Sequence, residues 1–351
     1  MTTKKATLKD VAKRAGVHVS TASRALDPRT RHRISADVAA KIAKAAQQLG
    51  YRHNQMAASL RTKKTNAIGI VIPDITNMLF PPIIRGVDDR IAPHGYISII
   101  GHTEGDAERE KRVIETLQVR GIDGLIVASA RLDDEAITSA MKDDVFIVTV
   151  NRRVKDEGVS SVVSDERSGV GAVLAHLVSL GHRHIGYASG PAWSSTGEAR
   201  LSAYRYWAGT HGIVHSESLI ARATEYREAE GARCVDVLLA SNPKLTAIVC
   251  ANDLLAIGAL AALKKRGISC PGDISVTGFN DIPFVDRITP SLTTVRIEHY
   301  QCGSAAAGIL LEDLQAGPVR REPRHIVLPV SLVVRESTGP APKPPRRKGS
   351  R

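Results

Sequence analysis

Cysteine is scarce in this chain. Its 351 residues include four cysteines, and none of them has the Cys-x-x-Cys spacing of a zinc site. We therefore expect isolated reduced thiols, with neither a disulfide framework nor a metal centre. The cysteines are Cys234, Cys250, Cys270 and Cys302.

Long apolar runs are also missing. The sequence has no stretch of about 18 apolar residues, the length that a membrane-spanning helix needs. The first residues, Met1 to Lys5, are not followed by the apolar core of a signal peptide. We expect a cytoplasmic protein with no membrane partner.

Common catalytic signatures are absent as well. The sequence has no Gly-x-x-x-x-Gly-Lys-Ser/Thr phosphate loop, no Gly-x-Ser-x-Gly elbow and no His-Glu-x-x-His metal motif. The basic cluster His182-Arg183-His184 follows a predicted helix. Cationic side chains suit a helix C-terminus, so we interpret this cluster as structural. We expect no enzyme activity, no catalytic residue and no cofactor.

Positive charge is concentrated at the N-terminal end. Residues 1–65 contain 15 Lys and Arg but only three acidic residues, so they account for the whole net charge of +12. The tail from 341 to 351 adds five basic residues, which leaves residues 66–340 with a net charge of −5. A basic head on an acidic body indicates a polyanionic partner for the head.

The basic segment contains a helix-turn-helix pattern. Thr7 and Asp10 are spaced as a capping box. Apolar residues then recur on one helical face until Gly16 ends the helix. A second helix opening near Val19 leaves short or basic side chains outside, which lets its backbone approach DNA. These outer side chains are Ser20, Thr21, Ser23 and Arg24.

A third helix completes a small α-helical headpiece. Ser35 is placed to cap it, and Gly50 to end it. The next segment, 51–62, has room for two helical turns, too few to be stable alone, and suits a helix that folds only when it docks.

From residue 67 onward, apolar runs alternate with helical patterns. This alternation predicts parallel sheets covered on both faces. Similar runs at 67–73 and 184–191 open two like lobes, and ligands of such sheets bind at the carboxyl ends of the strands. The predicted strands are 68–72, 96–100, 124–127, 145–150, 162–164, 185–188, 247–250, 274–279, 292–295 and 325–330. The predicted helices are 82–93, 106–120, 166–180, 198–212, 228–240, 253–266 and 300–314.

Taken together, these motifs resemble the LacI/GalR family of bacterial transcription regulators, from about Thr7 to Glu336. Each motif alone is weak, but their order and spacing are specific. The matching stretches are 7–12 with Gly16-Val17, 23–26, 49–51 with Asn54, 57–60, 181–185, 251–253, 274–281 and 290–295.

The resemblance implies four parts and a fold. These are an all-α helix-turn-helix headpiece (1–51), a hinge helix with a linker (52–66), a two-lobed α/β core like periplasmic binding proteins with parallel sheets (67–340), and a basic tail (341–351) that we expect to be disordered. It also implies three crossings between lobes, near 164–165, 279–291 and 324–330. We assign 67–164 and 292–323 to the first lobe, and 165–290 and 325–338 to the second. The proline-rich tail lacks the apolar heptad helix of the family's tetramers, so we expect a homodimer.

The resemblance also implies DNA contacts. It places Val19 and Ser20 at the main positions that read the major groove, with Thr21 and Arg24 nearby. Arg24 can reach a phosphate or a guanine edge. Leu60 matches the hinge leucine that is wedged into the minor groove at the operator centre. The other expected DNA-binding residues are Thr7, Leu8, His18, Asn54 and Ala57, of which His18 fits a surface role equally well.

The family's effector-contacting positions fall on eight residues here. Asn151 and Asn280 stand where sugar-binding members often have aspartate, which accepts bonds from hydroxyls but repels anions. With Arg200 nearby, two asparagines favour an anionic effector such as a sugar acid, while a neutral sugar held by amides stays open. The expected effector residues are Phe80, Asn151, Trp193, Ser194, Arg200, Tyr226, Asn252 and Asn280.

These expectations describe a nucleoid-associated repressor of carbohydrate or sugar-acid catabolic genes. It would bind a palindromic operator on double-stranded DNA as a dimer. A small-molecule effector in the interlobe cleft would order or melt the hinge helices, with the sign left open. Two alternatives are a regulator of the same family co-repressed by a purine-like ligand, and a solute-binding protein. The basic headpiece and the missing signal peptide oppose the second.

Overall fold

The structure is a computed structural model that describes residues 6–26, 30–51, 64–214, 216–242, 244–317 and 321–342. The chain divides into two compact units, Met1–Thr65 and Asn66–Arg351. The first unit contains the predicted headpiece (1–51), and we call the second unit the core. Each is described by itself. Across the residues described, no helix is long and apolar enough to cross a membrane.

The headpiece packs its helices around a small apolar centre. Val11, Ala22 and Ile42 are fully buried there. The predicted capping box is confirmed: the amide and hydroxyl of Thr7 both donate to Asp10, and Gly16 takes a left-handed conformation with φ of 66°. The elements are α1 (Leu8–Ala15), α2 (Val19–Leu26), the short 3₁₀ helix η1 (Arg31–Arg33) and α3 (Ala36–Gln48).

One predicted cap is not made. Ser35 occupies the N-cap position of α3, but its side chain forms no capping hydrogen bond. Asp37 supplies negative charge in the first turn, which favours the positive end of the helix dipole.

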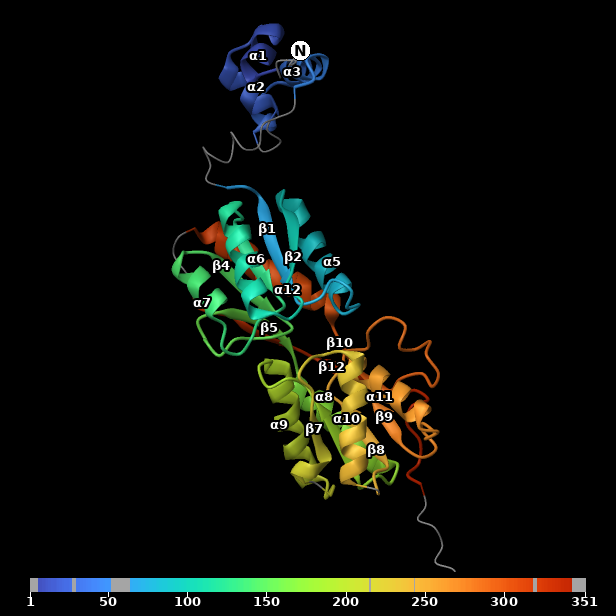
Figure 1. Ribbon diagram of the computed structural model, residues 1–351. Helices are drawn as coiled ribbons and strands as arrows, with labels where there is room; N and C mark the ends of the chain where they lie inside the picture. Colours follow the sequence, from blue (N-terminus) through green and yellow to red (C-terminus); the bar gives the residue numbers. More distant parts are fainter. Residues whose placement is uncertain are drawn as a thin grey trace, which may run out of the picture. The chain divides into compact units, whose positions relative to one another are not determined.

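The first lobe of the core is built on a six-stranded parallel sheet with strand order β11-β5-β4-β3-β1-β2 (Figure 1). Alternate residues of β1 face opposite layers: Ile68 and Ile70 join one apolar cluster and Val71 joins the other. The strands are β1 (Ala67–Ile72), β2 (Ile97–His102), β3 (Gly124–Val127), β4 (Phe146–Val150), β5 (Ser160–Ser164) and β11 (His325–Leu328). The helices are α5 (Phe80–Ile91), η2 (Ala92–His94), α6 (Ala107–Val119), α7 (Glu135–Lys142) and α12 (His299–Ala316).

Helices α5 and α12 approach unusually closely. A Cβ added at Gly303 would lie 1.9 Å from the carbonyl oxygen of Ile83, and one at Gly86 would lie 2.1 Å from that of Tyr300. Only glycine at both positions allows this backbone contact. It brings a late segment of the chain onto the first lobe.

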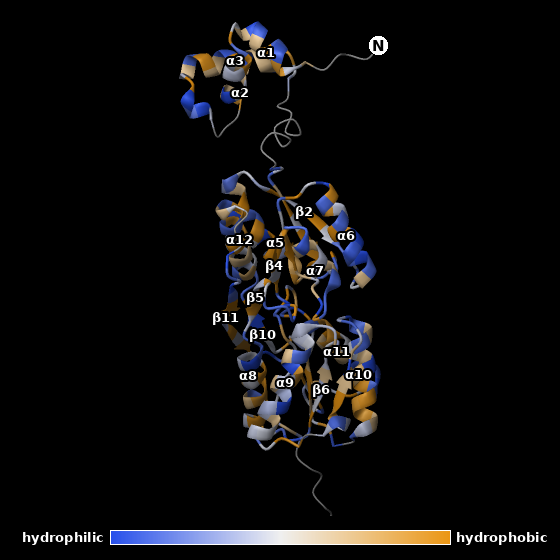
Figure 2. Cartoon of the chain, turned by 90° about the vertical axis from the view of Figure 1, so that its left-hand side faces the viewer, coloured by the Kyte–Doolittle hydropathy of each residue, from blue (hydrophilic) through white to orange (hydrophobic). Residues whose placement is uncertain are grey.

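The second lobe has a four-stranded parallel sheet with strand order β7-β6-β8-β9. In Figure 2 its strands are mostly hydrophobic, whereas its helices carry both hydrophobic and hydrophilic residues. The strands are β6 (Ile185–Ser189), β7 (Ile220–Arg222), β8 (Ala247–Cys250) and β9 (Ser275–Thr277). The helices are α8 (Glu166–Ser179), α9 (Ser195–Thr210), η3 (Glu217–Leu219), α10 (Glu228–Ser241) and α11 (Asp253–Lys265).

A two-stranded antiparallel ribbon lies between the lobes. It consists of β10 (Thr294–Ile297) and β12 (Val330–Val333), and we call it the crossing ribbon. The chain also crosses at Ser164, which ends β5 in the first lobe one residue before the N-cap of α8.

The predicted fold class, an all-α headpiece and a two-lobed α/β core, is confirmed. Some details differ. We expected residues from 325 onward in the second lobe, but β11 pairs with β5 in the first, and only the chain after β12 returns to the second. The predicted strand 325–330 is two strands, while α7 and β7 were not predicted; β7 has only three residues and therefore little pattern.

The tail also begins later than expected. The amide of Ala341 donates to the carbonyl of Leu180, and the ring of His182 bonds the carbonyl of Gly339 and the hydroxyl of Thr246. His182 therefore fastens the end of the core, as the structural interpretation of its cluster predicted. The rest of the tail, 343–351, lies outside the described residues.

Candidate functional site

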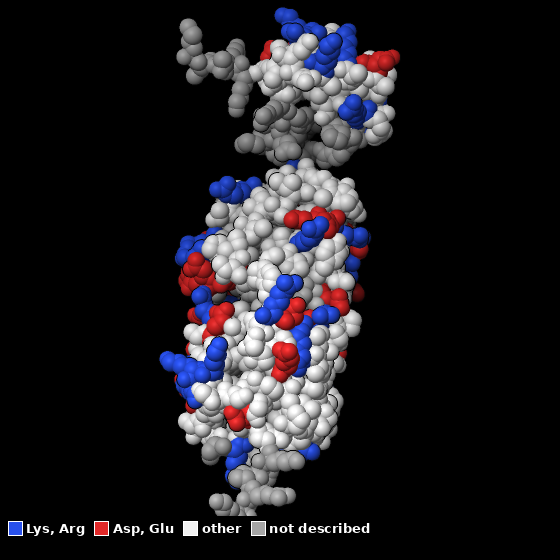
Figure 3. Space-filling view, turned by 90° about the vertical axis from the view of Figure 1, so that its right-hand side faces the viewer, with Lys and Arg blue, Asp and Glu red and all other residues white. Residues whose placement is uncertain are grey.

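The first candidate site is the outer face of α2 in the headpiece. His18, Ser20 and Arg24 are exposed, and Thr21 is half-buried. The amide of Ser20 donates to Nδ1 of His18 at 3.3 Å, and its hydroxyl lies 2.8 Å from the same atom. These two residues thus form one polar pair at the start of the helix. Lys and Arg are spread over the headpiece surface in Figure 3.

The other expected DNA-binding residues differ in setting. Val19 and Leu8 pack partly against the headpiece centre, and Thr7 is bonded to Asp10 in the capping box. Their side chains therefore have a structural task in addition to any DNA contact. Asn54, Ala57 and Leu60 lie outside the described residues.

The second candidate site is a pocket of about 370 Å³ between the two lobes. It lies where several strands end: Asp74, Arg131 and Arg152 follow β1, β3 and β4, while Trp193 and Tyr226 follow β6 and β7. This is the edge of a parallel sheet where ligands bind. A ligand here would touch both lobes at once.

Two arginines of the first lobe lie against an aromatic residue of the second. The guanidinium carbon of Arg131 is 4.3 Å from the centre of a Trp193 ring, and that of Arg152 is 5.0 Å from it. Arg152 is also 5.7 Å from the ring centre of Tyr226. Such cation–π contacts hold the guanidinium groups in place without neutralising them.

The predicted residues Trp193, Ser194 and Tyr226 lie together. The indole of Trp193 donates to the carbonyl of Thr224 at 3.3 Å. The hydroxyl of Thr196 is 2.9 Å from those of both Ser194 and Tyr226. Of these three predicted residues, Trp193 and Tyr226 line the pocket, and Ser194 is fully buried behind it.

Arg200 already has hydrogen-bond and ion-pair partners within the protein. It is only 2% exposed, lies over the ring of Phe279 at 3.7 Å and forms a two-bonded ion pair with Glu166. Its remaining bonds go to the carbonyl of Ala251 at 2.5 Å and to Oδ1 of Asn280 at 3.3 Å. The charge of Arg200, a predicted effector residue, is therefore balanced by Glu166.

The three predicted asparagines have different settings. Asn280 holds a φ of 119° and accepts from Arg200, whereas Asn252 caps α11 by accepting the amide of Leu255 at 2.9 Å. Asn151 has a φ of 64° and lines a separate hollow of about 210 Å³ with Glu166. Phe80 is buried in the first lobe and borders a third hollow rather than the interlobe pocket.

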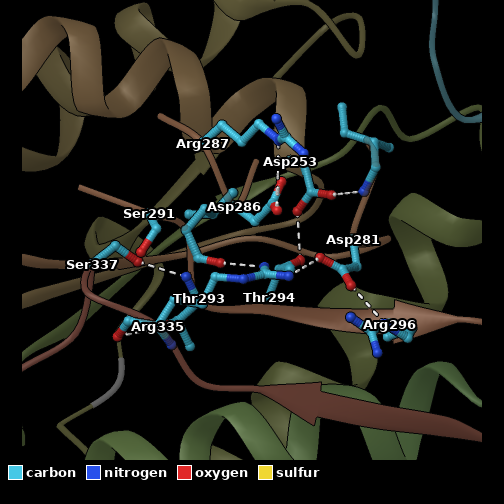
Figure 4. Close-up of polar contacts among 12 residues, drawn as sticks. Asp253, Asp281, Asp286, Arg287, Ser291, Thr293, Thr294, Arg296, Arg335 and Ser337 are labelled. Carbon is cyan, nitrogen blue, oxygen red and sulfur yellow. Dashed lines mark hydrogen bonds and ion pairs between the residues drawn. The ribbon is translucent and has the colours of Figure 1, made fainter. Parts of the chain in front are cut away.

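A polar network joins the second lobe to the crossing ribbon (Figure 4). Asp281 accepts from Arg296 of β10 at 2.6 Å and from Arg335 after β12 at 2.7 Å. Asp253, at the start of α11, bonds the hydroxyl of Thr294 and the amide of Ile282, and burial raises the pKa of Asp253 to about 6. Asp281 directly follows Asn280, which contacts Arg200. The residue that contacts Arg200 and the residue that holds the ribbon are thus neighbours in the chain.

Several charged side chains in or near the pockets were not predicted from the sequence. Glu166, Arg131 and Arg152 were not predicted for the effector site. Glu110, on α6, is 3% exposed and bonded by the hydroxyl of Ser129. None of these residues stands in a motif of its own. Their positions shortly after a strand, or on a helix that packs against a strand, would have been a useful signal for a place near the pocket.

Two family models match the chain. One, for bacterial regulatory proteins of the lacI family, covers residues 7–54. The other, for a periplasmic binding protein-like domain, covers residues 174–338. The two matches fall on the headpiece and the core, respectively.

Named relatives match over nearly their full length. The HTH-type transcriptional repressor CytR of Escherichia coli K12 is 30% identical over 338 residues, which cover 96% of this chain and 97% of CytR. The ribose operon repressor of Halalkalibacterium halodurans is 28% identical, covering 95% and 97%. Among solved structures, the lac repressor dimer bound to operator and the anti-inducer ONPF superposes with a TM-score of 0.82 at 26% identity, covering 96% of this chain and all of that one.

Proposed function

This chain belongs to the LacI family of ligand-responsive bacterial transcription regulators, and we propose that it represses genes for the catabolism of a sugar or sugar acid. The observation that carries this proposal is the interlobe pocket, which places Trp193 and Tyr226 of one lobe opposite Arg131 and Arg152 of the other. A ligand in contact with both walls stabilises one lobe orientation over others, and this difference in affinity is what a switch requires.

We propose that the crossing ribbon carries the signal. A shift of the second lobe moves Asn280 and with it Asp281, which holds both strands of the ribbon. The first lobe follows the hinge segment in the chain, so a change in lobe orientation changes the spacing of two hinges in a dimer. Paired hinge helices would form or melt accordingly.

We propose that α2 reads the operator. Ser20 and Arg24 are exposed on it, and an arginine can make a bidentate contact to guanine. Val19 and Thr21 flank them, with His18, Thr7 and Leu8 at the helix starts. Basic residues elsewhere on the headpiece would contact phosphates and set the affinity without setting the sequence.

The test begins with the DNA. Selection of bound fragments from a random library by the full chain should yield a palindromic sequence. In gel-shift titrations its affinity should fall steeply with salt, on the order of a thousandfold between 50 and 200 mM for six or more phosphate contacts. Arg24→Ala should relax the selected sequence, whereas Lys44→Ala, an exposed basic residue of α3, should not. A library with no enriched sequence would contradict the proposal.

The effector class is tested by calorimetry. Sugar acids and the matching neutral sugars are titrated into the full chain, and any ligand found is added to the operator complex. Binding by either class, with a change in operator affinity, supports the proposed regulator. Tight binding of neutral sugars alone rejects the anionic effector.

A further inference from the structure

Arg152 is a buried cation with few partners. It is 5% exposed, and one guanidinium nitrogen donates to the carbonyl of Ser129 at 3.1 Å. Its Nε has no hydrogen-bond partner, and no carboxylate among the described residues lies within ion-pair distance of it. Glu110, which accepts from the hydroxyl of Ser129, interacts electrostatically with Arg152 from beyond that distance. A buried charge without a directly bonded counter-ion is costly, so such groups are normally paired.

Arg131 is similar but more exposed. Within the described ranges it makes no ion pair, and its guanidinium donates only to the carbonyl of Gly105, at 3.3 Å. Both arginines line the pocket and lie against Trp193. Two positive charges therefore converge on one space.

The acidic residues that line the same pocket already have hydrogen-bond or ion-pair partners within the protein. Asp74 accepts two bonds from Thr76, and Asp106 caps α6. Glu104 pairs with Arg109 at 2.7 Å, and Glu225 pairs with Arg227 at 2.6 Å. Asp74 and Asp106 keep their negative charge but direct their oxygens to these donors, whereas Arg131 and Arg152 are the lining cations that make no ion pair among the described residues.

We infer that Arg131 and Arg152 form an anion subsite that binds the carboxylate or phosphate of the effector. This inference rests on the proposed effector pocket and refines it. The guanidinium forks suit bidentate recognition of either group, and the rings of Trp193 and Tyr226 hold the forks from the side. The assignment moves the anion away from Arg200, whose charge Glu166 neutralises.

Small anions test the subsite without knowledge of the effector. Sulfate is titrated into the full chain at constant ionic strength, and tryptophan fluorescence is followed, because Trp193 contacts both arginines. A Trp207→Phe variant assigns the signal to Trp193. Phosphate and malonate are compared in the same way, and the tighter of the two indicates whether the effector carries a phosphate or a carboxylate.

We expect sulfate to cause a saturable change in the tryptophan fluorescence of the unmodified chain. In Arg131→Gln the affinity for sulfate should fall at least tenfold. Arg152→Gln should lower the sulfate affinity equally if the variant folds, which circular dichroism checks. If it does not fold, the result for Arg131→Gln alone tests the subsite. The matched control is Arg153→Gln, the exposed neighbour that lines a different hollow. No saturable change in the unmodified chain, an unchanged affinity in Arg131→Gln, or an equal loss in Arg153→Gln overturns the subsite.

The anion titration and the DNA selection fail separately, so their outcomes can be told apart. Enrichment of an operator without anion binding removes only the subsite. Anion binding without an enriched operator leaves the subsite in place and rejects the repressor. The DNA selection is therefore run on the same preparations, without added sulfate or phosphate.

Discussion

At the scale of single residues, Glu110 makes the core sensitive to pH. Burial, and to a lesser degree the charge of Asp134, raise the pKa of Glu110 to about 7 from 4.5, against the opposing effects of Ser129, Arg152 and Arg131. The folded state therefore holds a proton that the unfolded state has released between about pH 4.5 and 7. Stability must fall as pH rises through this range, because the folded state binds more protons there.

We predict that Glu110→Gln removes this pH dependence. The unmodified core should lose up to about 3 kcal/mol of unfolding free energy through Glu110 between pH 5 and 8, at about 1.4 kcal/mol per pKa unit. Asp253 contributes in the same direction, so the difference between variant and unmodified chain isolates Glu110. Urea unfolding at several pH values measures it, with Glu115→Gln, exposed on the same helix, as the control. Parallel pH profiles for Glu110→Gln and the unmodified chain would contradict the prediction.

The same proton should affect the anion subsite. Ionised Glu110 partly offsets Arg152, so sulfate should bind more tightly at pH 6 than at pH 8. Sulfate suits this measurement because it does not titrate in that range. In Glu110→Gln the affinity should be nearly constant, and a sulfate affinity that rises with pH in the unmodified chain would be the opposite of this expectation.

At the scale of elements, the crossing ribbon depends on one carboxylate. The side chain of Asp281 is 7% exposed. It forms ion pairs with Arg296 in β10 and with Arg335, which follows β12. Removing one partner of a buried ion pair is costly because the remaining charges lose their counter-ion.

We predict that Asp281→Asn lowers the unfolding free energy of the core by about 2–4 kcal/mol, somewhat less than a fully buried pair because Arg296 is half exposed. Urea unfolding measures the change. The matched control is Asp286→Asn in the same loop, whose ion pair with Arg287 is exposed and 4.0 Å long and should contribute less than about 0.5 kcal/mol. Equal effects of the two substitutions would show that Asp281 does not hold the ribbon.

At the scale of the whole molecule, operator binding should depend on the hinge as well as on α2. The sequence resemblance predicts that Leu60 is a hinge leucine, which would be wedged between base pairs and bend the DNA so that two headpieces bind together. We predict that Leu60→Ala weakens binding to the selected operator at least about tenfold, or 1.4 kcal/mol. Gel-shift titration measures the affinity, while an unchanged urea transition of the core shows that the core remains folded. Unchanged operator affinity would reject the hinge role of Leu60.

Local features and the order of the elements could be predicted from the sequence alone. The capping box of Thr7 and Asp10 and the left-handed turn at Gly16 depend on residues within a few positions of one another. Strands such as 124–127 and 247–250 were predicted at their observed bounds because they are short apolar runs between turns. The positive charge of the headpiece follows from its numbers of basic and acidic residues.

The tertiary structure decided which charges are free. Arg200 and Asn280 were predicted as effector contacts, yet the charge of Arg200 is balanced by Glu166, which lies 34 positions away in another helix. Arg131 and Arg152 follow different strands and meet only because parallel strands end at one edge of a sheet. Likewise, β11 joins the first lobe through pairing with β5, some 160 positions earlier. Pairing over such distances depends on how whole elements pack, and no local pattern records it.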